Sequence, residues 1–107
     1  MNDIQKLKKR VRNSKAWRTL RHDKNVEQKG VDPITLKKLT KTANLHHMNM
    51  DISEYSNLEN TEDFVMLNKM THDTIHFCYK YQMEDDGFLD RLVYWTKRMV
   101  ERNKKMT

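Results

Sequence analysis

Residues 63–76 read DFVMLNKMTHDTIH, and this stretch decides the predicted fold. Its first part, DFVML, alternates apolar positions and contains β-branched and aromatic side chains, which predicts a short strand. Asn68 then stands at the place of a helix N-cap, and a helix is expected over residues 69–82. Because positions i and i+4 share one face of a helix, His72 and His76 are expected to point the same way. Two imidazoles presented side by side make a candidate metal site.

A second histidine pair lies upstream, in the segment LHHM at residues 45–48. Residues 42–48 predict another short strand, and adjacent strand residues point to opposite faces. His46 and His47 are therefore not expected to face the same metal ion. This division suits a hydrolytic site, where one histidine holds the metal and its neighbour takes a proton from water. Taken separately, each pair also fits a plain half-buried strand or a polar helix face.

Composition and length predict one small domain, residues 1–107. The chain is 36% hydrophobic and 34% charged, so its core must be thin. No apolar run approaches the roughly 20 residues that cross a bilayer, and the charged N-terminus lacks the apolar core of a secretory signal. A single cysteine, Cys78, excludes an internal disulfide and a four-cysteine zinc site. We expect a cytoplasmic protein with no membrane partner.

Charge is spread unevenly along the chain. The net charge is +6, and residues 1–30 hold ten Lys and Arg, whereas residues 42–68 hold five acids and no Lys or Arg. We interpret residues 1–30 as a basic helical arm, which favours a polyanion partner and most simply DNA. A solvated helix face explains this charge equally well.

Three further signals complete the predicted element order. Ser14 is expected to cap a second helix that begins at Lys15, and Gly30 is a natural stop for it. Residues 49–61 are rich in Asn, Asp, Ser and Glu and are expected to form a loop. Residues 87–105 predict a C-terminal amphipathic helix. The order is helix, strand, loop, strand, helix, helix, which is an α+β fold.

This ordered set resembles the HNH endonucleases, the ββα-metal or His-Me finger nucleases, and most closely their small phage-encoded members. The family pattern is an apolar strand ending in His-His or Asp-His, a loop, N-[LF]-[VI]-x-L, four residues and a His, often with another His four residues on. Here LHHM, DFVML, NKMT and the two later histidines follow in that order, and SKAWRTLR resembles the W-x-x-L-R helix that precedes the motif. The resemblance covers residues 14–77. It implies a ββα-metal core over residues 42–82, a short two-stranded antiparallel hairpin plus a metal-binding helix, flanked by N- and C-terminal helices.

The resemblance also implies roles for individual residues. His47 matches the general base, and His46, His72 and His76 match the ligands of one divalent metal ion (Mg²⁺, Mn²⁺, Ni²⁺ or Zn²⁺), as in colicin-type nucleases. Asp63 replaces the central Asn of the family name; it can accept the same hydrogen bond but cannot donate one. We expect its charge to raise the pKa of His47, which would leave less free base at neutral pH.

The implied activity is a metal-dependent DNA endonuclease that nicks one strand or cleaves both, encoded by a bacteriophage and acting in the host cytoplasm. The basic arm would then contact phosphates and position the duplex without reading sequence. Its candidate DNA-binding residues are Lys8, Lys9, Arg12, Arg18 and Arg21. A homodimer or a larger phage protein complex is the expected assembly for double-strand cleavage.

The chain lacks the zinc knuckle that many members carry. Asp32, Thr35, Asn68 and Thr71 stand where the cysteines would be, so we expect packing to hold the fold instead. The candidate core residues are Trp17, Leu36, Leu39, Leu67, Phe77, Leu92 and Trp95.

Two other functions remain open at this point. The chain fits a catalytically weak relative that serves as a DNA-binding or host-defence-inhibiting phage protein. HDTIH at residues 72–76 also resembles the H-E-x-x-H pattern of zinc peptidases. Its Asp is one methylene shorter than the catalytic Glu, and the chain is short for a peptidase cleft, so the nuclease interpretation is favoured.

Overall fold

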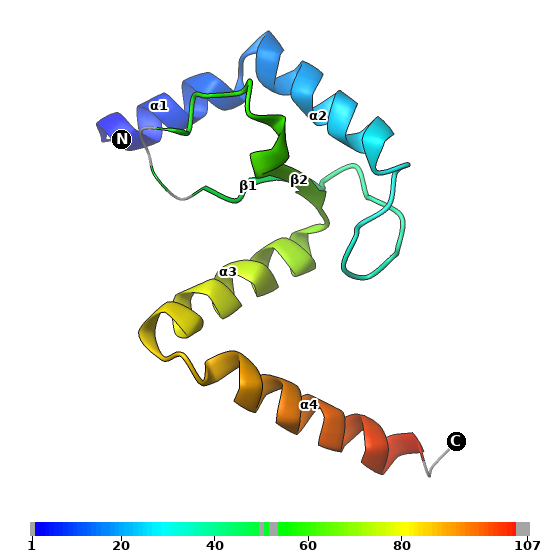
Figure 1. The fold of residues 1–107 in the computed structure, drawn as a ribbon. Helices are drawn as coiled ribbons and strands as arrows, with labels where there is room; N and C mark the ends of the chain where they lie inside the picture. The colour runs from blue at the N-terminus through cyan, green and yellow to red at the C-terminus, as the bar shows by residue number, and fades with distance from the viewer. Residues whose placement is uncertain (1, 50, 52–53, 105–107) are drawn as a thin grey trace. The chain divides into compact units, whose positions relative to one another are not determined.

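The computed structural model describes residues 2–49, 51 and 54–104. Within them the fold is α+β, with four α-helices and one two-stranded antiparallel sheet (Figure 1). The elements are α1 (Asp3–Arg12), α2 (Lys15–Glu27), β1 (Asn44–His47), the 3-10 helix η2 (Thr61–Asp63), β2 (Phe64–Leu67), α3 (Lys69–Glu84) and α4 (Phe88–Lys104). The predicted α+β class is confirmed, and so is the predicted order from the first strand to the C-terminal helix, whereas α1 and α2 stand where that order has one helix. The ββα-metal core stays a prediction.

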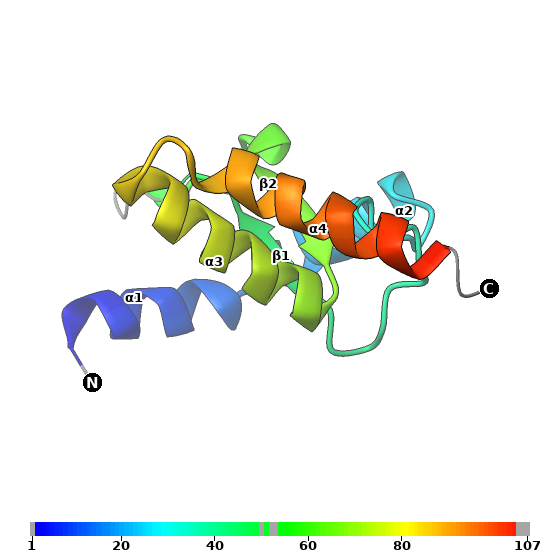
Figure 2. The same ribbon diagram turned by 90° about the horizontal axis from the view of Figure 1, so that it is seen from below.

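The chain forms two compact units, Met1–His72 and Asp73–Thr107, whose boundary falls inside α3. The first unit contains α1, α2, both strands and the first turn of α3. The second contains the rest of α3 and then α4, which follows a short turn (Figure 2). Residue 105, the end of the predicted C-terminal helix, lies outside the described residues. The single domain expected from the sequence stays a prediction.

Local caps set the two N-terminal helices. The Asn2 side chain accepts a hydrogen bond from the Gln5 N–H (2.8 Å), and the Gln5 side chain accepts one from the Asn2 N–H (3.1 Å). This capping box begins α1. The Ser14 hydroxyl accepts a hydrogen bond from the Trp17 N–H at 3.2 Å, so α2 begins at Lys15 as predicted.

The sheet is small, and one of its edges is covered by a side chain. In the β1–β2 register, His46 lies opposite Val65 and His47 lies opposite Phe64. The amide of Gln28 accepts a hydrogen bond from the Met66 N–H (2.7 Å) and donates one to the Met66 carbonyl (2.9 Å). The Gln28 side chain thereby makes the two hydrogen bonds to Met66 that a neighbouring strand would make. It satisfies a backbone N–H and a carbonyl at the edge of the sheet that could otherwise pair with another strand.

The core lies in the first unit, between α1, α2 and the sheet. The Trp17 ring meets the Phe64 ring edge to face at 5.9 Å and stacks on Tyr55 at 6.0 Å. The predicted core positions Trp17, Leu39 and Leu67 are buried. The other members of the core are Val11, Leu20, Ala43, Leu45, Phe64 and Met66.

Four predicted core residues are exposed instead: Leu36 (75%), Phe77 (51%), Leu92 (38%) and Trp95 (65%). Leu36 has a φ of +62°, and this left-handed conformation places it in a turn rather than in the core. Phe77, Leu92 and Trp95 lie in the second unit, where two helices are the only described elements. A pair of helices has no further layer to cover its remaining apolar side chains, so these residues stay exposed. No helix among the described residues has the length and apolar character needed to span a membrane.

Asp32, which stands where many HNH endonucleases have a zinc-knuckle cysteine, is a buried carboxylate. Asp32 is 0% exposed. Its Oδ1 accepts hydrogen bonds from the N–H groups of Ile34 (2.8 Å) and Thr35 (3.2 Å), and its Oδ2 accepts from the Asn68 N–H (3.0 Å) and the Thr71 hydroxyl. The sequence had led us to expect that packing alone holds this region. The hydrogen bonds of Asp32 hold it as well. A hydrogen-bonded carboxylate joins the loop after α2 to the start of α3.

Candidate metal centre

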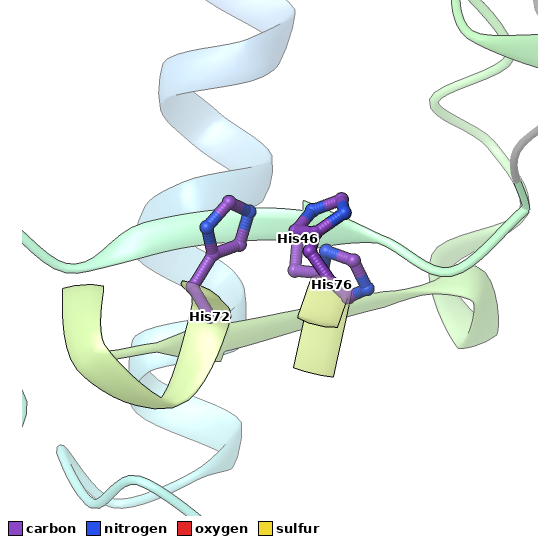
Figure 3. Close-up of side chains that lie close together, drawn as sticks. All are labelled: His46, His72 and His76. Carbon is purple, nitrogen blue, oxygen red and sulfur yellow. The ribbon is translucent and has the colours of Figure 1, made fainter. Parts of the chain in front are cut away.

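Three of the five histidines gather at one place, as expected from the resemblance. His46 comes from β1, whereas His72 and His76 come from successive turns of α3 (Figure 3). One candidate ligand nitrogen of each ring lies within 4.8 Å of the others. Since β2 pairs with β1 and runs into α3 through one residue, Asn68, the first turn of the helix begins close to His46.

The donor set fits one transition-metal ion. A zinc ion bound at 2.0–2.1 Å holds its imidazole nitrogens about 3.3 Å apart, so small side-chain rotations would close the observed spacing. The His46 and His72 rings already meet edge to face, with centroids 5.2 Å apart. Neutral imidazoles suit Zn²⁺ and Ni²⁺ better than Mg²⁺, which prefers oxygen ligands. Three protein ligands would leave further coordination positions for water or a phosphate oxygen.

His47 lies on the other face of β1, as the strand period predicts. Its ring stacks on Phe64, its partner across the sheet, with centroids 4.4 Å apart and planes 10° from parallel. Tyr55, from the loop between the strands, lies 6.0 Å away on a tilted plane. These rings leave His47 8% exposed.

The surroundings of His47 favour the neutral imidazole. Burial lowers the pKa of His47 below its ordinary value of 6.5, and the negative charges of Asp63 and Glu54 offset this only in part. The charge of Asp63 raises the pKa of His47 as we expected, but desolvation outweighs that charge, so the expected loss of free base does not follow. Nδ1 of His47 is buried and has no hydrogen-bond partner among the described residues. A charged ring would carry a proton on that atom at an added cost, so His47 is held in the form that accepts protons.

Asp63 ties the inter-strand loop to the end of β1. Its backbone carbonyl accepts a hydrogen bond from the Met48 N–H at 2.7 Å, directly after His47. Its carboxylate accepts one from the Asn60 side chain at 3.0 Å. The link to His47 is electrostatic, since the charge of Asp63 raises the pKa of that histidine against the effect of burial.

Two of the predicted DNA-binding residues lie near the loop that covers His47. The Lys8 ammonium group sits over the Tyr55 ring, 5.4 Å from its centroid. Burial raises the pKa of Tyr55, and the charge of Arg12 partly offsets this. Tyr55 therefore connects the basic face of α1 to the surroundings of His47.

The other three predicted DNA-binding residues are placed differently. Lys9 is exposed on α1. Arg18 donates to the Asn13 carbonyl at 2.9 Å, and Arg21 donates to the Lys41 carbonyl at 3.5 Å. Each of these arginines keeps further N–H groups with which it could contact a phosphate.

Sequence reasoning missed two residues near the candidate base, Glu54 and Tyr55. Both belong to the polar loop between the strands, where hydrophobic period gives no guide to position. The one available signal was that Tyr55 is the single aromatic residue of residues 49–61. No protein-family model matches the chain, and no curated protein or solved structure matches it.

Proposed function

We propose that this protein is a metal-dependent DNA endonuclease whose ββα-metal motif consists of β1, β2 and α3. The observation that carries the proposal is the gathering of His46, His72 and His76, with the buried His47 as the immediate neighbour of the first. A metal site of this kind beside a proton acceptor can support phosphodiester hydrolysis, because the metal stabilises the phosphate charge and the base activates water.

The three gathered histidines would hold one divalent ion through their imidazole nitrogens. When bound, the ion supplies positive charge that stabilises the negative charge building on the phosphate and on the leaving 3′ oxygen. The strand-to-helix junction gives the site a rigid base, because His46 lies on β1 and His72 on the first turn of α3. Side chains on a strand and a helix hold the geometry of a reactive site more precisely than side chains on loops do.

His47 would accept the proton of the attacking water. The water oxygen forms a bond to phosphorus as the bond from phosphorus to the 3′ oxygen breaks. The imidazolium formed in this step gains stabilisation from the charges of Asp63 and Glu54, both of which raise the pKa of His47. Burial keeps the base free before reaction, and the carboxylates stabilise it after proton transfer.

The basic residues of α1 would bring the DNA backbone to this site. The Lys8 ammonium group lies over the Tyr55 ring, and the charge of Arg12 lowers the pKa of Tyr55. The ring centroids of Tyr55 and His47 are 6.0 Å apart. Contacts to phosphate neutralise backbone charge and fix position without specifying sequence.

One observation favours a second candidate, a DNA-binding protein that uses the fold without efficient catalysis. His47 is 8% exposed, and a general base must come within hydrogen-bond reach of its water. If Tyr55 and Phe64 keep the ring covered when DNA is bound, the protein would bind without cleaving.

Cleavage of supercoiled plasmid separates these functions. Purified protein is incubated with plasmid and EDTA, Mg²⁺, Mn²⁺, Ni²⁺ or Zn²⁺, beside the variant His47→Ala. We expect metal-dependent nicked or linear product, lowered about 100-fold or more in His47→Ala. The matched control is His22→Ala, which removes an exposed histidine of α2 and should cleave as the wild type does.

Binding of DNA with no cleavage under any metal would overturn the nuclease proposal and favour the binding protein. Equal cleavage by His47→Ala and the wild type would assign the base elsewhere.

A further inference from the structure

The start of α3 is held by a residue outside the three-histidine cluster. We propose that Asp32 is a positioning residue of that cluster: its carboxylate fixes the first turn of α3 and thereby the placement of His72 and His76 against His46. This inference rests on the proposed metal site, which it deepens. It assigns Asp32 no contact with the metal or with DNA.

The contacts of Asp32 divide between two segments. Oδ1 accepts hydrogen bonds from the N–H groups of Ile34 and Thr35, which closes the loop on itself. Oδ2 accepts from the Asn68 N–H (3.0 Å) and from the Thr71 hydroxyl, which are the last residue before α3 and a residue of its first turn. One fully buried side chain therefore holds the loop and the helix start together.

A second set of hydrogen bonds reinforces this junction. The Asn68 side chain accepts from the Thr40 N–H (2.8 Å) and donates to the Lys38 carbonyl (3.0 Å). These contacts tie Asn68 to the segment that follows Asp32, so the junction is restrained on two sides.

The buried carboxylate is well suited to a helix start. N–H groups at a helix N-terminus carry partial positive charge and lack partners within the helix, and a nearby carboxylate stabilises them. Burial alone would raise the pKa of Asp32, but hydrogen bonds from Thr71, Asn68, Ile34 and Thr35 lower it further than burial raises it. Asp32 is thus ionised at neutral pH, and all four of its partners are donors.

The position of the first turn decides the geometry of the cluster. Thr71, which Asp32 holds, is the residue before His72, and His76 follows one helical turn later. Metal ligands must meet one ion within tenths of an ångström, so a shift of this turn would separate the α3 histidines from His46. Residues that orient metal ligands typically contribute 10- to 100-fold to metal affinity.

The test is the Ni²⁺ affinity of variants that remain folded, measured by isothermal titration calorimetry at one pH, with folding checked by circular dichroism. Asp32→Asn keeps the shape of the side chain but presents an NH₂ group where a donor already points. We expect its Kd for Ni²⁺ to rise about 10- to 100-fold. Thr71→Val should raise the Kd in the same direction, and Thr71→Ser, which keeps the hydroxyl, should bind as the wild type does.

Ser14→Ala is the matched control for lost stability. It removes the cap of α2, so it should lower the melting temperature and leave the Kd unchanged. An unchanged Kd in folded Asp32→Asn and Thr71→Val would overturn the inference while leaving the metal site in place. If Asp32→Asn does not fold, Thr71→Val decides. A wild-type protein that binds no Ni²⁺ would instead overturn the metal site, and the inference with it.

Discussion

The His47 ring lies flat against the Phe64 ring, with centroids 4.4 Å apart and planes 10° from parallel. The two residues face each other across β1 and β2, so the pairing of the strands brings the rings together. Among the described residues Nδ1 of His47 has no hydrogen-bond partner. Stacking, worth about 0.5–1.5 kcal/mol for such a ring pair, therefore restrains this imidazole without a hydrogen bond to Nδ1.

Phe64→Leu should loosen the proposed base while keeping the position apolar. We expect the free energy of unfolding to fall by about 1–3 kcal/mol, because a buried ring is lost. Plasmid cleavage should fall several-fold at a temperature where the variant is still fully folded. The control is Phe88→Leu, which removes a half-buried ring at the start of α4 and should leave cleavage unchanged. Equal cleavage by Phe64→Leu and the wild type would show that the stack has no part in placing His47.

Asp63→Asn tests the balance between burial and charge at His47. Burial already keeps His47 neutral, so removing the carboxylate gains no free base. It does remove charge that stabilises the imidazolium, and the pKa of His47 should fall further. We expect cleavage to drop several-fold, much less than in His47→Ala, and the His47 NMR titration to move to lower pH. A marked rise in cleavage would mean that Asp63 impairs the native site.

Acid should weaken the junction that Asp32 holds. Burial raises the pKa of Asp32, but its hydrogen bonds lower it more, so the net pKa lies below the ordinary 3.8. The stability that Asp32 contributes is fully present above that ordinary value and is lost as the pH falls through the folded-state pKa. At pH 7, Asp32→Asn should lower the free energy of unfolding by about 2 kcal/mol. Urea titrations should show this difference from the wild type shrinking below about pH 4; a difference that stays constant would contradict an ionised Asp32.

Arg12→Gln should weaken DNA binding without changing sequence preference. A lost phosphate contact lowers the magnitude of the slope of log K against log salt by about 1. Fluorescence anisotropy with a labelled duplex at several salt concentrations measures this slope. Lys97→Gln, an exposed lysine of α4, is the control and should leave the slope unchanged. The same slope in Arg12→Gln and the wild type would remove Arg12 from the DNA interface.

Local signals in the sequence predicted much of the fold. Ser14 caps α2 and β2 begins at Phe64, because capping and strand alternation depend on neighbouring residues. The opposite orientation of His46 and His47 likewise follows from the period of a strand. The i, i+4 spacing of His72 and His76 placed both on one helix.

Contacts between distant segments could not be predicted in this way. The helix α3 begins after Asn68 as expected, but nothing in the sequence indicated that the Asn68 side chain accepts a hydrogen bond from the Thr40 N–H and donates one to the Lys38 carbonyl. In the sequence, Asp32 was noted only as standing where a zinc-knuckle cysteine would be. Its role depends on hydrogen bonds from Asn68 and Thr71, which are 36 and 39 residues away. Tyr55 reaches His47 through a loop without hydrophobic period. Such contacts are set by the assembled fold, which one sequence does not reveal.

The most direct test of the account is the stoichiometry of Zn²⁺ binding in isothermal titration calorimetry, compared between the wild type, His76→Ala and His22→Ala. Three histidines that share one ion predict one equivalent in the wild type and in His22→Ala, and an affinity lowered by orders of magnitude in His76→Ala. Equal Zn²⁺ binding by His76→Ala and the wild type, or no binding by the wild type, would contradict the proposed metal centre.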